Sequence, residues 1–185
     1  MIILLSGWSN SGKSTVAELL CERYQANVYA FADELKKIVA EEFQFPFEWT
    51  QTQEGKQQLA PNGKTVRELL IQRGQEIRAE KNDLGFFARQ VAKEIHKAEQ
   101  SGLHVVSDWR LPIELETLKQ EFPDMRIVTV RIQRDGQEES PVADSLTEHE
   151  LDTYFFEYVL KNAGKNKDAL AFAITTMLFV LETSR

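Results

Sequence analysis

The stretch that decides the fold is Gly7-Trp8-Ser9-Asn10-Ser11-Gly12-Lys13-Ser14. It fits the pattern G-x-x-x-x-G-K-[ST] in full, between an apolar run at residues 2–5 and a segment whose apolar residues have helical spacing. Its two glycines let the backbone turn tightly. Successive N–H groups can then surround an anion at the start of a helix, where the dipole favours negative charge. The stretch therefore predicts a phosphate-binding loop that joins a buried strand to a helix.

The residue types in this loop predict how it holds a nucleoside triphosphate. The Lys13 ammonium would reach the β- and γ-phosphates, and the Ser14 hydroxyl would ligate Mg²⁺. A second metal ligand, direct or through water, is expected in Asp108, which follows the apolar residues 103–107. Asp108 could instead cap the helix that begins near residue 111. The residues expected to bind ATP are Gly7, Ser9, Asn10, Ser11, Gly12, Lys13, Ser14 and Thr15.

Apolar segments alternate with helical patterns along the chain. Strands are expected at residues 1–6, 28–31, 103–107, 126–132 and 154–160. Helices are expected at residues 13–24, from the N-cap Asp33 onward, and at 64–81, 83–100, 111–121 and 166–182. Residues 44–64 are expected to form a mobile loop. This alternation predicts an α/β fold class, with a five-stranded, mostly parallel sheet covered by helices on both faces.

The composition limits the class of protein. The chain has 185 residues, of which 42% are hydrophobic, and this suits one domain over residues 1–185. A net charge of −7 argues against duplex nucleic acid as a partner, because such binding needs a positive face. No apolar run approaches the ~20 residues that span a bilayer. The opening run is too short for a signal peptide, so we expect a soluble, cytoplasmic protein.

Two residues with reactive side chains are expected to be structural. Cys21 is the single cysteine, which excludes an intrachain disulfide and fits a reducing compartment. We expect its thiol to be packed in the core. His104, within a predicted strand, is also expected in the core. The aromatic residues at 43–49 could roof the core or stack on a base, and burial in the core is favoured.

The sequence departs from the motifs of GTP-dependent switches. Residues 166–168 are Asn-Lys-Asp, without the spacer of Asn-Lys-x-Asp, and no glycine follows Asp108 at the required place. Motor and AAA-type ATPases are normally larger chains. A small kinase remains, which would move the γ-phosphoryl group of ATP to a small acceptor. Such an enzyme needs cations around the transferring group and its acceptor.

Two arginines share one face of a predicted helix. At about 100° per residue, Arg67, Gly74 and Arg78 fall within about 40° of one another. This face could present two guanidinium groups to an anion, and Gly74 would let a ligand or backbone approach closely. Alternatively, both arginines pair with Glu76 or Glu80 or are simply solvated.

Three further arginines stand where predicted strands end. Arg110 follows Asp108, and Arg131 and Arg134 flank the end of the fourth strand, where a lid would begin. In these places they could spread positive charge over a transferring phosphoryl group. Arg134 could also be an ordinary surface residue.

The order of motifs resembles that of the bacteriophage-type deoxynucleoside monophosphate kinases, over nearly the whole chain. Besides the phosphate loop, the resemblance is carried by Phe31-Ala32-Asp33-Glu34-Leu35-Lys36, by Arg67, Leu70, Gly74 and Arg78, by Asp83, by Asp108-Trp109-Arg110-Leu111-Pro112, by Arg131 and Arg134, by Thr147-Glu148 and by Asn162-Ala163-Gly164. The chain departs from the family pattern at Leu84-Gly85-Phe86, where a tryptophan is common, and at Ile113-Glu114, where Asn-Glu is common.

The resemblance implies a P-loop kinase fold with strand order 2-3-1-4-5. It also implies a helical acceptor-binding insertion at about 44–100 and a lid at about 133–147. The implied reaction moves the γ-phosphoryl group of ATP, with Mg²⁺, to a deoxynucleoside monophosphate. The implied catalytic residues are Lys13, Arg110, Arg131 and Arg134, and the implied metal ligands are Ser14 and Asp108. The implied acceptor-binding residues are Asp33, Lys36, Arg67, Gln72, Gly74, Arg78 and Asp83.

The expected partners are small-molecule nucleotides, with no nucleic acid and no membrane. The resemblance allows a homodimer, and it implies the host cytoplasm if the chain is encoded by a phage. Animal-type phosphomevalonate kinases have a similar layout, including the Asp-x-Arg strand end, so a non-nucleotide phosphate stays open as acceptor. A nucleotide-binding module without catalysis is a further alternative.

Overall fold

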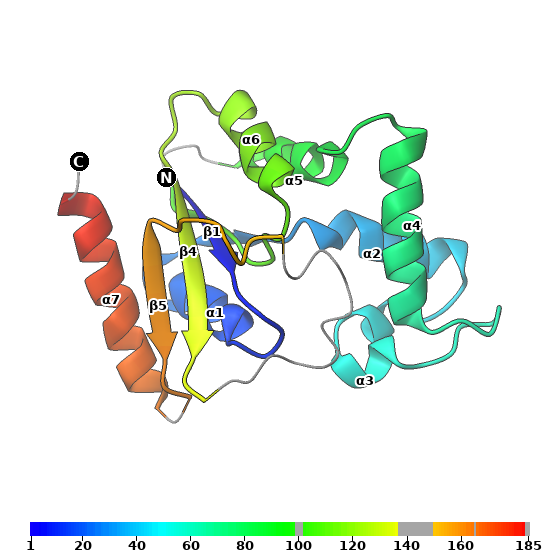
Figure 1. Ribbon diagram of the computed structural model, residues 1–185, viewed down its shortest axis with the longest axis horizontal. Helices are drawn as coiled ribbons and strands as arrows, with labels where there is room; N and C mark the ends of the chain where they lie inside the picture. Colours follow the sequence, from blue (N-terminus) through cyan, green and yellow to red (C-terminus); the bar gives the residue numbers. More distant parts are fainter. Residues whose placement is uncertain (99–101, 137–149, 165, 184–185) are drawn as a thin grey trace.

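A sheet of five parallel strands forms the centre of the protein (Figure 1). The computed structural model describes residues 1–98, 102–136, 150–164 and 166–183. The strands are β1 (Ile2–Ser6), β2 (Asn27–Tyr29), β3 (His104–Val106), β4 (Ile127–Arg134) and β5 (Tyr158–Asn162). Their order is β2-β3-β1-β4-β5, which confirms the order implied by the resemblance.

Helices cover both faces of the sheet, as predicted. They are α1 (Lys13–Tyr24), α5 (Phe86–Lys97), α6 (Pro112–Glu121) and α7 (Lys167–Thr183). Successive side chains of β1 point to opposite faces, so Ile3 and Leu5 pack with residues of α1 and α7. Ile2 and Leu4 pack with residues of α5 and α6. The central position of β1, covered on both sides, explains why its apolar run is continuous.

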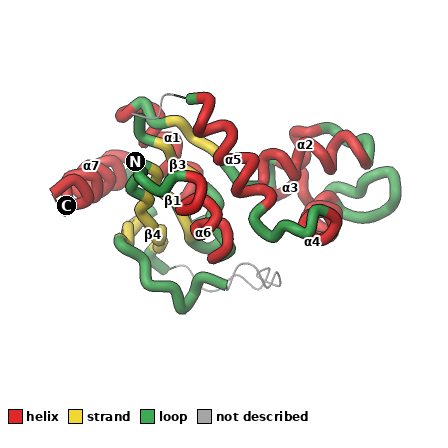
Figure 2. The backbone as a smooth tube through the Cα atoms, turned by 90° about the horizontal axis from the view of Figure 1, so that it is seen from above, coloured by secondary structure: helices red, strands yellow, loops and turns green. Residues whose placement is uncertain are grey.

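A helical lobe lies beside the sheet, on the side opposite α7 (Figure 2). It consists of α2 (Ala32–Glu42), the 3₁₀ helix η1 (Phe47–Thr50), α3 (Gln53–Lys56) and α4 (Val66–Glu80). Val39, Val66 and Leu69 belong to a small core of its own. Phe45 is buried there and stacks on Trp49 at 6.1 Å between ring centres, which confirms the roofing role favoured for the aromatic run. Phe47 is the exception, because its side chain is exposed.

Two predictions about residues 44–100 need correction. The expected loop at 44–64 was wrong in part, because it contains η1 and α3. Helix α5 lies within the range of the implied insertion but packs on the sheet, where Phe87, Val91 and Ile95 join the core that contains Ile2 and Leu4. The helical lobe therefore ends at α4.

Long-range contacts shift two predicted element boundaries. The fifth strand begins at Tyr158 instead of residue 154, because Tyr154 and Phe156 make edge-on contacts with the Trp109 ring. Helix α2 does not use Asp33 as its N-cap: its first N–H groups, of Phe31 and Ala32, donate to the carboxylate of Asp108.

The predicted position of Cys21 was wrong. Its side chain is exposed, because Val16, Leu19 and Leu20 supply the inward face of α1 and residue 21 turns toward solvent. His104 is fully buried, as expected, and its Nδ1 lies 3.3 Å from the Tyr29 hydroxyl. Among the described helices, none has the length and apolar character that crossing a bilayer would require. Of the predicted lid at 133–147, only residues 133–136 are described, and Thr147 and Glu148 also lie outside the described ranges.

Candidate active site

The predicted phosphate loop connects β1 to α1, and its conformation depends on two glycines. Gly7 has φ of +149° and Gly12 has φ of +102°, both in the region that L side chains rarely adopt. A Cβ atom at Gly7 would lie 2.5 Å from the Ile132 carbonyl oxygen, and one at Gly12 would lie 2.3 Å from Asn162 Nδ2. The ends of β4 and β5 therefore hold the loop so closely that no larger residue fits at these positions.

Polar groups of the loop point inward. The Lys13 ammonium donates to the carbonyl oxygens of Gly7 at 2.6 Å and Trp8 at 2.8 Å. The Ser11 hydroxyl is buried and has no hydrogen-bond partner among the described residues. An unpaired buried hydroxyl costs about 1–3 kcal/mol. An anion in the loop would supply the missing partner.

The turn after β5 braces the loop from the side. Asn162 Nδ2 donates to the Ser11 carbonyl oxygen at 2.9 Å, while its Oδ1 accepts from the Gly164 N–H at 3.0 Å. Arg134 Nη1 donates to the Asn10 carbonyl oxygen at 3.2 Å. The sequence shows Asn162 only as part of a motif, and this bracing role becomes visible only when β5 is placed beside β4.

Next to the loop lies a cavity of about 320 Å³, lined by Trp8, Lys161 and residues 131–136. Arg131, almost buried, pairs with Asp152 at 2.7 Å and donates to the Ser6 hydroxyl at 3.3 Å. Its guanidinium carbon lies between the rings of Trp8 and Phe156, 5.8 and 5.5 Å from their centres. Arg131 is therefore held by aromatic rings and a carboxylate, whereas Arg134 lies on the exposed edge of the loop.

Asp108 lies at the carboxyl end of β3, as predicted, and it caps α2 instead of the helix near residue 111 that was its alternative role. Its Oδ1 accepts from the Phe31 N–H at 2.7 Å and its Oδ2 from the Ala32 N–H at 3.0 Å, so it caps α2 and not α6. Burial raises the pKa of Asp108, and the two backbone donors and the charges of Lys36 and Arg110 oppose that shift.

The donor set fits a magnesium ion that arrives with a nucleotide. No group of three or more His, Cys, Asp or Glu side chains that could hold a metal occurs in the described part of the chain. Mg²⁺ keeps several waters and is usually held by one or two protein oxygens together with substrate phosphates. The Ser14 hydroxyl and the Asp108 carboxylate are oxygen donors of that kind, and the role of each toward a metal stays a prediction.

Glu114, which the sequence shows only as the acid of a helix start, is buried beside Arg78. Its Oε2 accepts from the N–H groups of Arg110 at 3.1 Å and Leu111 at 3.0 Å, and its Oε1 lies 3.9 Å from Arg78 Nη2. Burial and the nearby Asp108 charge raise the pKa of Glu114 to about 7. Burial lowers the pKa of Arg78, whose guanidinium lies 4.9 Å from the centre of the Phe87 ring.

Arg67 and Arg78 of α4 do not pair with Glu76 or Glu80, the carboxylates that the sequence offered as their alternative partners. Glu76 and Glu80 pair instead with Arg73. Arg67 donates from Nη2 to Gln53 Oε1 at 2.6 Å, and Gln53 Nε2 donates to the hydroxyl of Ser9 in the phosphate loop at 3.3 Å. The side chain of Gln53 thus connects α4 to the loop.

Lys56 lies on α3, as Gln53 does, and no pattern in the sequence identifies it as a site residue. Its side chain is half-buried among the charges of Lys36, Arg67, Arg110 and Asp108. Its position is hidden in the polar stretch 51–64, where the only signal of structure is Thr52, an N-cap residue type, before Gln53. The structure therefore places Lys56 near Lys36 and Arg67, which are predicted to bind the acceptor, and near Arg110, which is predicted to be catalytic.

The remaining predicted acceptor residues have partners of their own. Asp33 pairs with Lys36 at 3.1 Å. Gly74 lies against α2, since a Cβ atom there would be 3.1 Å from the Leu35 side chain, so the close approach comes from a side chain. Gln72 accepts from Lys64 at 2.6 Å and donates to Glu76 at 2.7 Å on the exposed side of α4.

Asp83 holds the start of α5. It accepts from the Gly85 N–H at 2.9 Å and from Arg89 Nε at 2.8 Å, and these bonds with Arg89 hold the pKa of the carboxyl below its ordinary value. The structure therefore connects Asp83 to the base of α5, through Gly85 and Arg89, which lie outside the cationic group around Lys56.

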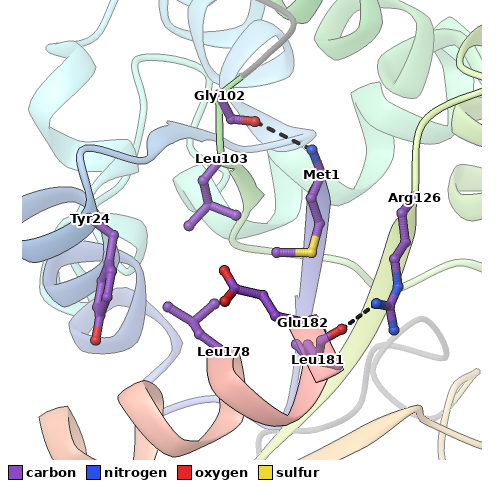
Figure 3. Close-up of a pocket in the computed structure, with 8 residues that line it drawn as sticks. All are labelled: Met1, Tyr24, Gly102, Leu103, Arg126, Leu178, Leu181 and Glu182. Atoms are coloured by element: carbon purple, nitrogen blue, oxygen red, sulfur yellow. Dashed lines mark hydrogen bonds between the residues drawn. The ribbon is translucent and has the colours of Figure 1, made fainter. Parts of the chain in front are cut away.

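A second cavity, of about 310 Å³, lies at the other end of the sheet, around the amino ends of β1 and β4 (Figure 3). There the Met1 ammonium donates to the Gly102 carbonyl oxygen at 3.3 Å, and Arg126 donates to the Leu181 carbonyl oxygen in the last turn of α7. Ligands of open parallel sheets bind at the carboxyl ends of the strands. The candidate site is therefore the one formed by the phosphate loop and the cationic group.

Comparisons with known proteins extend this description at the level of the fold. No protein-family model and no curated protein sequence matches the chain. Solved structures do resemble it. A sugar kinase from Janibacter sp. HTCC2649 is 14% identical with a TM-score of 0.51, covering 97% of this chain and 94% of that one.

Two further structures are similar to the same degree. A shikimate kinase from Bacteroides thetaiotaomicron is 13% identical with a TM-score of 0.50, covering 98% of each chain. A gluconokinase from Sinorhizobium meliloti 1021 is 14% identical with a TM-score of 0.50, covering 97% of this chain and 91% of that one. At such identities the likeness shows the fold, and the protein has the fold of the P-loop kinases.

Proposed function

We propose that this protein is an ATP-dependent kinase of deoxynucleoside monophosphates, which gives ADP and the deoxynucleoside diphosphate. The observation that carries the proposal is the side-chain bridge from Ser9 through Gln53 to Arg67. It joins a loop suited to a triphosphate to a cluster of cations suited to a second anion. Two anion sites that share a boundary are what phosphoryl transfer between two phosphorylated molecules requires.

In the proposed reaction, an oxygen of the acceptor phosphate forms a bond to the γ-phosphorus of ATP while the bond to the β,γ-bridging oxygen breaks. ADP leaves, and no general base is needed, because the acceptor phosphate is already anionic near neutral pH. Mg²⁺, held by Ser14 and through Asp108, would neutralise charge on the β- and γ-phosphates. Lys13 and Arg110 would stabilise the transferring group, and Arg67 and Arg78 would hold the acceptor.

Arg131 and Arg134 have different proposed roles on the donor side. Arg134, at the exposed edge of the phosphate loop, would close over the bound nucleotide. Arg131 is neutralised by Asp152 at 2.7 Å and donates to Ser6 of β1, so it would act on the donor only by exchanging that partner. We therefore expect a substitution of Arg134 to affect ATP binding more than a substitution of Arg131 affects it.

A kinase of a non-nucleotide phosphate, such as phosphomevalonate, is the second candidate. The fold neighbours, whose names are those of sugar, shikimate and gluconate kinases, support a non-nucleotide acceptor in general, although the acceptor group of such molecules is a hydroxyl and not a phosphate. An assay of ADP release over a panel of deoxynucleoside monophosphates and phospho-alcohols separates the two candidates. ATP binding without any acceptor-stimulated ADP release would instead indicate a nucleotide-binding module.

Two substitutions test the proposed sites. Lys13→Ala should abolish turnover, since the loop loses the cation that reaches the β- and γ-phosphates. Arg67→Ala should raise the KM for the acceptor by about 10- to 100-fold, as expected for the loss of a charge-assisted hydrogen bond of about 1.5–3 kcal/mol. Both are measured by steady-state kinetics with each substrate varied. Unchanged kinetics in Arg67→Ala would remove Arg67 from the acceptor site.

A further inference from the structure

Helix α3 is short, but its place is fixed by close contacts. The Thr52 hydroxyl accepts from the Gly55 N–H at 2.9 Å, which caps the first turn. A Cβ atom at Gly55 would lie 2.5 Å from the carbonyl oxygen of Trp49 and 2.7 Å from its Cα, so α3 rests directly on the backbone of η1. Side chains that extend from α3 are therefore placed by a rigid support.

One face of α3 is directed toward the candidate site. In Figure 1, α3 lies between α4 and the loop that leads from β1 to α1. Gln53 contacts both, through Arg67 at 2.6 Å and Ser9 at 3.3 Å. Residues three apart on a helix lie on the same side, so Lys56 extends from this face one turn further on.

The Lys56 ammonium lies in a positively charged environment. Burial is the largest cause that lowers the pKa of Lys56, and the charges of Lys36, Arg67 and Arg110 lower it further. The nearby Asp108 carboxylate opposes this shift only in part. These four groups come from α2, α4 and the segment after β3. Two carboxylates belong to this group, Asp108 and Asp33, the latter at 3.1 Å from Lys36, and the four cations outnumber them. An additional anion would therefore be favoured in this partly buried place.

We propose that Lys56 is an acceptor-binding residue, whose ammonium holds the doubly charged phosphate of the acceptor together with Lys36 and Arg67. This inference rests on the proposed function and deepens it. A cluster of this charge favours a phosphate monoester dianion over acceptors that carry one negative charge or none. Lys56 thereby determines the class of acceptor, and Gln53 sets the distance between that phosphate and the phosphate loop.

Acceptor kinetics provide the first test. Lys56→Met keeps the length of the side chain and removes its charge, and it should raise the acceptor KM about tenfold or more with the KM for ATP unchanged. Lys56→Arg should restore the acceptor KM to within a few-fold of wild type. Lys37→Met is the matched control, because Lys37 is exposed on α2 and faces Glu34. An unchanged acceptor KM in Lys56→Met would overturn the proposal.

A binding experiment separates this proposal from the proposed function. Methyl phosphate, a simple monoester, is titrated at pH 8 and followed by NMR in a Lys13→Met background, which removes the Lys13 ammonium and so weakens binding at the phosphate loop. We expect Lys56→Met to weaken this binding about tenfold and Lys56→Arg to retain it. If Lys56 governs methyl phosphate binding but no deoxynucleoside monophosphate is phosphorylated, the acceptor is another monoester and the proposal for Lys56 stands. Methyl phosphate affinity that is independent of residue 56 would contradict it.

Discussion

Glu114 is a carboxylate whose environment changes its chemistry. Only 4% of the residue is exposed, and burial together with Asp108 raises its pKa from the ordinary 4.5 to about 7. The folded protein therefore keeps a proton on this group at pH values where the unfolded chain has lost it. The contribution of Glu114 to stability is greatest below pH 4.5 and declines as the pH rises toward 7.

Replacing Glu114 should remove this pH dependence. Relative to wild type, we expect Glu114→Gln to gain free energy of unfolding as the pH rises from 4.5 to 8, by up to about 3 kcal/mol, because one pKa unit corresponds to about 1.4 kcal/mol. Urea unfolding of both proteins at several pH values measures the difference. Glu116 lies on the exposed side of the same helix, so the free energy of unfolding of Glu116→Gln should change with pH in the same way as that of wild type. If the stability of Glu114→Gln changed with pH as that of wild type does, the raised pKa of Glu114 would be contradicted.

Elements whose ends are marked by local chemistry are predicted well from the sequence. Helix α1 has the predicted bounds, because Gly12 at its start is required by the loop itself. Elements shaped by distant contacts are predicted less well. The cap of α2 comes from Asp108, and the aromatic residues before β5 pack on Trp109, so local patterns at Asp33 and Tyr154 mislead.

The same distinction between local and long-range signals applies to the candidate site. The phosphate loop and the arginines of α4 follow from motif spacing and helical periodicity. Gln53 and Lys56 do not, because their importance depends on α3 resting against Trp49, a contact that no local pattern reveals. Glu114 is identified as buried only when α6 is placed against α5, with Arg78 and the chain around Asp108 nearby.

Helix α3 should depend on its contact with η1. Gly55→Val would place a branched side chain where even a Cβ atom lies 2.5 Å from Trp49, and overpacking of this kind costs about 1–3 kcal/mol. We expect denaturant unfolding to show that loss together with a raised acceptor KM. At Gly63 an added Cβ meets nothing within 4 Å, but the φ of +81° is strained for alanine, so Gly63→Ala should lower stability and leave the acceptor KM unchanged. A Gly55→Val protein with wild-type stability and kinetics would show that α3 adapts freely.

At the scale of the whole molecule, charge is distributed unevenly. The chain carries a net charge of −7, yet Lys36, Lys56, Arg67 and Arg110 gather where the helical lobe meets the sheet. Local charge therefore matters more for an anionic ligand than the sum over the surface, because screening limits interactions between exposed charges to about 10 Å at moderate salt. The position of the lobe beside the carboxyl ends of the strands creates this local field.

The bond between Asp108 and the start of α2 also has a consequence for how the chain folds. Asp108 and Phe31 are 77 residues apart, so we expect this cap to form after local structure such as α1. In stopped-flow chevrons, Asp108→Ala, which removes both acceptor oxygens, should speed unfolding about 5- to 30-fold, equivalent to about 1–2 kcal/mol for a lost cap, with little change in the refolding rate. A slower refolding rate would instead place this contact in the nucleus.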